Sequence, residues 1–108
     1  MTKKEIAKHV ELSAFYKALA NPVRLAIIEK LSITETCICN DFVKELPFAQ
    51  ATISEHLRKL KQADLVSVCE KGSSSQYCLN KQRFKQLIKM QRQKIELHLF
   101  PSLSSNEI

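Results

Sequence analysis

The sequence contains one glycine, three prolines and no tryptophan among its 108 residues. A single glycine excludes most nucleotide-binding loops, because these loops need several glycines to let the backbone approach a phosphate. Aromatic residues make up 6% of the chain, which argues against a protein that binds single strands by base stacking. The sequence has no apolar run of membrane-spanning length and no signal peptide near its start. We therefore expect a soluble, cytoplasmic protein.

Enzyme signatures are also missing from the sequence. We find no nucleophile elbow, no glycine-rich phosphate loop and no recognisable motif that places a base beside a cysteine thiol. The sequence therefore predicts a protein that is not an enzyme.

The charge of the chain favours a polyanionic partner. Seventeen basic residues stand against 11 acidic ones, which gives a net charge of +6. The length suits one domain with a modest core, expected over residues 1–100, and a frayed tail over residues 101–108. In a reducing cytoplasm, the four cysteines are expected to be thiols and not a disulfide framework.

Residues 50–79 are the most informative stretch, because they read as an amphipathic helix followed directly by a β-hairpin. At roughly 100° per residue, Ile53, Leu57 and Leu60 fall on one side of the helix. The opposite side carries Ala51, Ser54, Glu55, Arg58 and Gln62. Polar side chains of this kind can hydrogen-bond base edges or phosphates, although an ordinary solvated face looks the same. The hairpin and the positive charge favour a nucleic-acid reader.

The hairpin is expected to turn at the only glycine, Gly72, and the serines that follow it. A symmetric register would pair Lys71 with Gln76 and Cys69 with Cys78. In that register, the face expected to meet the core carries Val66, Val68, Tyr77 and Leu79. A slip of one residue would exchange the two faces of the hairpin.

The rest of the chain supplies helices that surround this unit. A first helix is expected over residues 3–19, with a buried set of Ile6, Val10, Ala14 and Phe15. Asn21-Pro22 marks the start of a second helix, because asparagine caps free N–H groups and proline suits the first helical position. Its apolar stripe is Val23, Ala26, Ile27 and Leu31. A short extended segment at 34–38, which could pair next to the wing, precedes a short helix at 40–46, and this helix completes a helix-turn-helix unit.

A last helix is expected over residues 81–100, with an apolar stripe of Phe84, Leu87, Ile88, Ile95 and Leu99. A small domain does not need two long terminal helices to cover its core, so we expect the first and last helices partly to face a second subunit. A two-fold dimer would present two reading helices to successive major grooves, about 34–36 Å apart. Alternatively, the last helix packs only on its own domain.

Residues 12–80 resemble the ArsR/SmtB-like winged helix-turn-helix transcriptional regulators, through ALANPVRLAIIEKL, CICNDFVKEL, AQATISEHLRKLKQADLV and the glycine-tipped wing. The resemblance implies a mainly α fold with a small β-hairpin wing. It also implies a homodimeric repressor of an operator near its own promoter, with base contacts at Gln50, Ala51, Ser54 and Glu55. These positions and further polar residues of the helix and the hairpin tip form the predicted DNA-binding set: Gln50, Ala51, Thr52, Ser54, Glu55, Arg58, Lys59, Lys71, Ser73 and Ser74.

Two positions depart from the family pattern. Asp64 stands where the family usually has glycine, and a helix C-terminus needs a left-handed residue that aspartate supplies less readily. Glu55-His56 stands where members often have two histidines. Glu55 would repel phosphates but could accept from a cytosine amino group. His56 is expected to be a packed or capping histidine and not a ligand.

Many family members release DNA when a metal binds, and Cys37-Ile38-Cys39-Asn40-Asp41 resembles their Cys-x-Cys-Asp motif. Paired thiolates suit a thiophilic metal or metalloid, but two are too few for a tetrahedral site. His9 of the expected first helix could supply a third ligand to this site, although nothing in the sequence requires it. The family's other metal site is expected to be absent, because Glu96 and His98 point apart on a helix.

Other roles for the cysteines stay open at this point. A structural zinc site would use Cys37, Cys39, Cys69 and Cys78, although their spacing matches no finger or ribbon pattern. Oxidation of Cys69 with Cys78 could distort the wing, whereas cysteines that merely pack are more common.

The alternative function is a winged-helix protein-interaction module that does not read DNA, because a fold does not by itself give a function. The excess of basic residues argues against this alternative. Salt dependence separates the two, since phosphate contacts weaken steeply with salt and an apolar protein interface does not.

Overall fold

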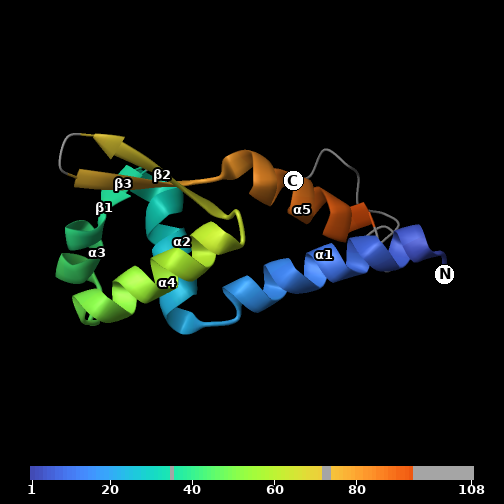
Figure 1. Ribbon diagram of the computed structural model, residues 1–108, viewed down its shortest axis with the longest axis horizontal. Coiled ribbons are helices and arrows are strands. Elements are labelled where there is room, and N and C mark those ends of the chain that lie inside the picture. Colours follow the sequence, from blue (N-terminus) through green and yellow to red (C-terminus); the bar gives the residue numbers. More distant parts are fainter. Residues whose placement is uncertain (35, 72–73, 94–108) are drawn as a thin grey trace.

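The computed structural model describes residues 1–34, 36–71 and 74–93. Figure 1 shows α2, α3, α4 and the sheet gathered toward one end of an elongated molecule, with α1 and α5 at the other. The principal extents are 47 × 29 × 26 Å. The elements in chain order are α1 (Lys3–Leu19), α2 (Pro22–Thr34), β1 (Thr36–Ile38), α3 (Cys39–Glu45), α4 (Gln50–Gln62), β2 (Val66–Lys71), β3 (Ser74–Leu79) and α5 (Lys81–Gln91). The predicted fold class, mainly α with a hairpin wing, is confirmed.

Side-chain caps start three of the helices. Asn21 Oδ1 accepts from the amides of Val23 at 2.9 Å and Arg24 at 3.2 Å, which confirms the predicted start of α2. Thr2 caps α1 and Asn80 caps α5 in the same way. These caps satisfy amides that have no partner within the helix.

The end of α4 is a Schellman motif. The Leu65 amide donates to the Leu60 carbonyl at 3.0 Å, and the Asp64 amide donates to the Lys61 carbonyl at 3.0 Å. Asp64 has a φ of 61°, so the expected left-handed position is present without its usual glycine. Leu60 and Leu65 are both fully buried, as the hydrophobic contact of this motif requires.

The sheet has three antiparallel strands in the order β1-β3-β2. The predicted hairpin register is wrong by two residues, because Lys71 pairs with Ser74 and Cys69 pairs with Gln76. Two residues therefore separate the paired strand ends, and connections of this length are the commonest in hairpins. A shift of two changes the partners but preserves the faces, so Val66 and Val68, now opposite Leu79 and Tyr77, still share one face with them as predicted. The short segment before α3 does pair beside the wing, as β1 on β3.

One hydrophobic core joins all five helices and the sheet. The predicted inner sides of α2 and α4 are confirmed, since Ile27, Leu31, Ile53, Leu57 and Leu60 are all fully buried. Phe42 of α3 belongs to the same core and is also fully buried.

The predicted inner side of α1 is wrong for the single chain, apart from Phe15. Ile6 is 49% exposed, Val10 is 64% exposed, and Ala14 is also exposed. Leu12, which the prediction missed, is buried together with Phe15. Only one narrow stripe of α1 therefore meets its own core, while a second apolar stripe faces outward.

Helix α5 packs along α1. The rings of Phe15 and Phe84 meet edge to face with centroids 5.5 Å apart, and Tyr16 donates to the Gln91 side chain at 2.5 Å. Leu87 is buried, whereas Ile88 is 44% exposed. Helix α5 ends at Gln91, and the part of the predicted helix after residue 93, together with the predicted tail, lies outside the described residues. No helix in the part of the chain that the structure describes is both long and apolar enough to span a bilayer.

Candidate nucleic-acid interface

The outward side of α4 is polar apart from Ala51. Packing of Ile53, Leu57 and Leu60 against the core turns the other side of this helix to solvent. The predicted DNA contacts on this helix are all exposed: Gln50, Ala51, Thr52, Ser54, Glu55, Arg58 and Lys59. The structure therefore brings together, on one accessible helix, seven of the ten residues predicted from the sequence.

The first turn of α4 has no side-chain cap. Its N-cap residue is Ala49, which makes no side-chain hydrogen bond, so the amides that follow it lack the acceptor that caps α2. Amides at a helix N-terminus can donate to a phosphate oxygen. The end of α4 expected to enter a groove therefore also offers backbone donors.

Glu55 and Arg58 form a two-point ion pair on the outward side of α4. Arg58 Nη2 lies 2.5 Å from Glu55 Oε1, and Arg58 Nε donates to Glu55 Oε2 at 3.0 Å. The hydrogen bond from Arg58 lowers the pKa of Glu55, with smaller contributions from the Arg58, Lys59 and His56 charges, although partial desolvation opposes this. Both groups are thus charged at neutral pH, and the pair itself carries no net charge.

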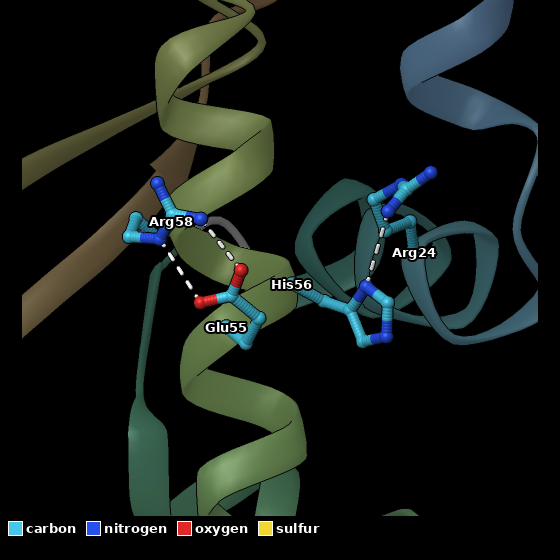
Figure 2. Close-up of polar contacts among 4 residues, drawn as sticks. All are labelled: Arg24, Glu55, His56 and Arg58. Carbon is cyan, nitrogen blue, oxygen red and sulfur yellow. Dashed lines mark hydrogen bonds and ion pairs between the residues drawn. The ribbon is translucent and has the colours of Figure 1, made fainter.

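His56 points away from that pair, toward α2, as Figure 2 shows. Its Nδ1 lies 3.2 Å from Nη1 of Arg24. Desolvation by burial is the main cause that lowers the pKa of His56, and the charges of Arg24 and Lys59 lower it further. The expectation of a packed histidine agrees with this half-buried position.

Sequence reasoning missed Arg24, which lies 32 residues from its histidine partner. A signal was present, because Arg24 stands in the first turn of α2, where the helix dipole disfavours a positive charge. A basic residue at such a position indicates an acceptor elsewhere in the fold. That acceptor is the C-terminal end of α1, where Arg24 Nε donates to the Ala18 carbonyl at 2.5 Å.

The predicted wing contacts are placed only in part. Lys71 ends β2 and Ser74 begins β3, and Figure 1 shows these strand ends at the same end of the molecule as α3 and the start of α4. Ser73 and the side chains of Lys71 and Ser74 lie outside the described residues. The backbone therefore puts the wing on the same end of the molecule as the start of α4.

The register separates the cysteines of the wing. Cys78 lies opposite Ser67, whose Oγ is 2.8 Å from Cys78 Sγ, and Cys69 lies opposite Gln76. The predicted cross-strand pair of Cys69 and Cys78 is therefore wrong. Diagonal neighbours stand about 7–8 Å apart, beyond the usual reach of a disulfide.

The predicted metal site at Cys37 and Cys39 falls on residues of which the structure describes only the backbone. Cys37 lies opposite Tyr77, and Cys39 is the first residue of α3. The side chains of Cys37, Cys39 and Cys69 lie outside the described part of the structure. Among the described residues, no three His, Cys, Asp or Glu side chains stand close enough to hold a metal ion.

A short helix, a turn, an exposed polar helix and a β-hairpin together define a winged helix-turn-helix protein. Comparisons with known proteins identify the family within this class. The model of the family described as "Bacterial regulatory protein, arsR family" matches residues 21–68. The arsenical resistance operon repressor of Staphylococcus xylosus is 39% identical over 70 residues, which cover 65% of this chain and 66% of that repressor.

Two further comparisons agree. An uncharacterized HTH-type transcriptional regulator of Methanocaldococcus jannaschii is 33% identical over 84 residues, covering 77% of this chain and 93% of that protein. An ArsR-like transcriptional regulator from Rhodococcus sp. RHA1 shares the fold, with a TM-score of 0.75 at 19% identity over 86% of both chains. The chain belongs to the arsR family of bacterial regulatory proteins. This confirms the family resemblance, and the family consists of transcriptional regulators and not of enzymes.

Proposed function

We propose that this protein is a homodimeric transcriptional repressor that binds a double-stranded operator in the cytoplasm and is released by an effector. The observation that carries the proposal is the exposed polar side of α4, held outward by three fully buried apolar residues. The net charge of +6 and the printed name of the staphylococcal relative, an operon repressor, support it. A winged helix-turn-helix reads DNA by placing its second helix in the major groove.

Each side chain on α4 has a role that suits its chemistry. Gln50 and Ser54 hydrogen-bond base edges, and Ala51 lies where it can contact a thymine methyl group. The remaining contacts are to phosphates and come from α4 and the wing: Thr52, Arg58, Lys59, Lys71, Ser73 and Ser74. Glu55 accepts from a cytosine amino group and excludes sites that lack one.

The dimer would form through α1 and α5. Ile6 and Val10 of α1 and Ile88 of α5 are large apolar residues that the single chain leaves exposed. These three residues lie on the two terminal helices, which pack on each other along one end of the molecule (Figure 1). A two-fold interface there would cover the exposed residues and would set two copies of α4 one helical turn of DNA apart.

The effector proposed is a thiophilic metal or metalloid bound through Cys37 and Cys39. Two thiolates one residue apart suit a soft ion, and the staphylococcal relative is named for arsenical resistance. A thiol titration of the native protein with and without arsenite tests this proposal. Protection of two thiols supports it, and unchanged reactivity of Cys37 and Cys39 contradicts it.

The DNA-binding proposal is tested on the reading helix itself. Arg58→Ala and Gln50→Ala should each weaken binding to the operator duplex by about tenfold, while the dimer mass is unchanged. Analytical ultracentrifugation provides the dimer mass for each variant. If both variants bind as the parent does, α4 is not the reading helix.

A further inference from the structure

Arg24 joins three helices from a position outside the predicted DNA contacts. Its Nε donates to the Ala18 carbonyl at 2.5 Å, and its Nη2 donates to the Lys17 carbonyl at 3.4 Å, both at the end of α1. Its Nη1 lies 3.2 Å from Nδ1 of His56 on α4. One guanidinium group on α2 therefore connects the C-terminal end of α1 to the reading helix (Figure 2).

Both ends of this connection are chemically suited to it. The last carbonyls of α1 have no partners within that helix, and the negative end of the helix dipole attracts the guanidinium charge. The fork of the guanidinium group lets it donate in two directions at once, which a lysine ammonium cannot match in geometry. His56 can accept at Nδ1 only in its neutral form, because a protonated ring has donors alone.

The contact constrains how α4 is rotated about its axis. His56 and Glu55 are adjacent in sequence, and in Figure 2 they project in different directions, His56 toward Arg24 and Glu55 toward Arg58. The other anchors of α4, such as Ile53 and Leu57, are apolar, and apolar packing has no preferred direction. The hydrogen bond at His56 is directional, so it adds a restraint on the rotation of α4 to the apolar packing that turns its polar side outward.

We propose that Arg24 is a positioning residue for DNA reading, which holds α4 in register with α1 through His56 and releases it when His56 is protonated. This inference rests on the proposed function, because it assumes that α4 reads DNA. The charged groups that act on the His56 ring are Arg24 from α2 and Glu55 and Lys59 from α4. Only Glu55 favours a protonated ring, and it is already paired with Arg58.

The test uses the full-length protein and fluorescence anisotropy of two labelled duplexes, one from upstream of the gene and one scrambled. Arg24→Gln should lower the affinity for the upstream duplex by about tenfold and leave the affinity for the scrambled duplex unchanged. The dependence of affinity on salt should also be unchanged, because no phosphate contact is removed. Circular dichroism at the assay temperature measures how much of each variant is folded.

His56→Gln is the matched variant, because a glutamine carbonyl can accept from Arg24 but does not titrate. The parent should bind fully at about pH 8 and lose affinity for the upstream duplex only as the pH falls below about 6.5, because the pKa of His56 in the folded protein is lowered from that ordinary value. His56→Gln should bind as the parent does at the higher pH and should keep most of that affinity at the lower pH. The difference between the two profiles isolates His56 from the other histidines.

Three results would overturn the inference, and each has a separate meaning. If the Arg24→Gln protein discriminates between the two duplexes as well as the parent does, Arg24 has no positioning role. Equal losses on both duplexes, with a shallower salt dependence, would mean that Arg24 contacts phosphate directly. A parent protein that does not discriminate between the duplexes would remove the proposed function, and the inference would fail with it.

Discussion

At the scale of single residues, Glu55 has the largest predicted effect on which DNA is bound. Glu55→Gln removes a negative charge from the proposed DNA-binding side of α4 and frees Arg58 from its two-point ion pair. We expect affinity for a scrambled duplex to rise, with a salt dependence steeper by about one phosphate contact. Discrimination between the upstream and scrambled duplexes should fall by roughly tenfold, about 1.4 kcal/mol, because the charged acceptor for the cytosine amino group becomes a neutral amide, which can also donate to other bases.

Anisotropy titrations over a range of salt concentrations measure both effects. Glu45→Gln is a suitable control, because Glu45 is also paired with a basic residue, Lys30, but lies on α3. If Glu55→Gln instead binds every duplex more weakly, the carboxylate serves only to hold the Arg58 side chain in place.

His56 also predicts how stability depends on pH. Burial and the Arg24 charge hold the pKa of His56 in the folded protein below its ordinary value near 6.5. As the pH falls below about 6.5, the unfolded chain takes up this proton first, so the free energy of unfolding falls. Urea unfolding should therefore show a loss of stability in acid that is smaller in His56→Gln, and equal losses in the two proteins would contradict this.

Periodicity explains which residues could be predicted. Ile53, Leu57 and Leu60 recur at helical spacing, so their burial and the exposure of the opposite side were readable from the sequence. The contact of Arg24 with His56 was not readable, because it depends on how α2 packs against α4. No local pattern encodes a pair of residues 32 positions apart.

At the scale of elements, α4 ends in a Schellman motif whose left-handed position is occupied by an aspartate and not by the usual glycine. Asp64 holds a φ of 61°, which costs a residue with a Cβ about 1–2 kcal/mol. Asp64→Gly should raise the free energy of unfolding by about 0.5–1 kcal/mol, since the greater freedom of glycine in the unfolded chain offsets part of the gain. Thermal unfolding measures the change. Asp64→Ala is the matched control and should not be stabilising.

In the wing, the strands could be predicted from the sequence but their register could not. Alternating residues such as Val66 and Val68 identified the strands and their inner face correctly. The run Gly72–Ser75 does not mark one turn centre, because several of its residues suit a turn equally. The register therefore came out two residues away from the predicted one, and the cysteine pairing predicted from it was wrong.

At the scale of the whole molecule, the outward stripe of α1 predicts the assembly. Val10 is 64% exposed in the single chain, so Val10→Glu leaves the core of the subunit intact. In the proposed dimer it would bury a charge at the interface and shift the protein toward monomer in analytical ultracentrifugation. Affinity for a full operator should fall with it, because one subunit reaches only one half-site.

Lys3→Gln is the control, because it lowers the net charge by the same one unit at an exposed position at the start of α1. A Val10→Glu protein that remains dimeric would place the interface elsewhere.

The central claim is that α4 and the wing read a specific duplex. It is tested most directly by the anisotropy of a labelled duplex from upstream of the gene against a scrambled duplex, at two salt concentrations. We predict tight binding to the upstream duplex alone, weakened steeply by salt. Equal, weak and salt-sensitive binding to both duplexes would contradict the claim, because the basic charge would then be a general phosphate-binding surface.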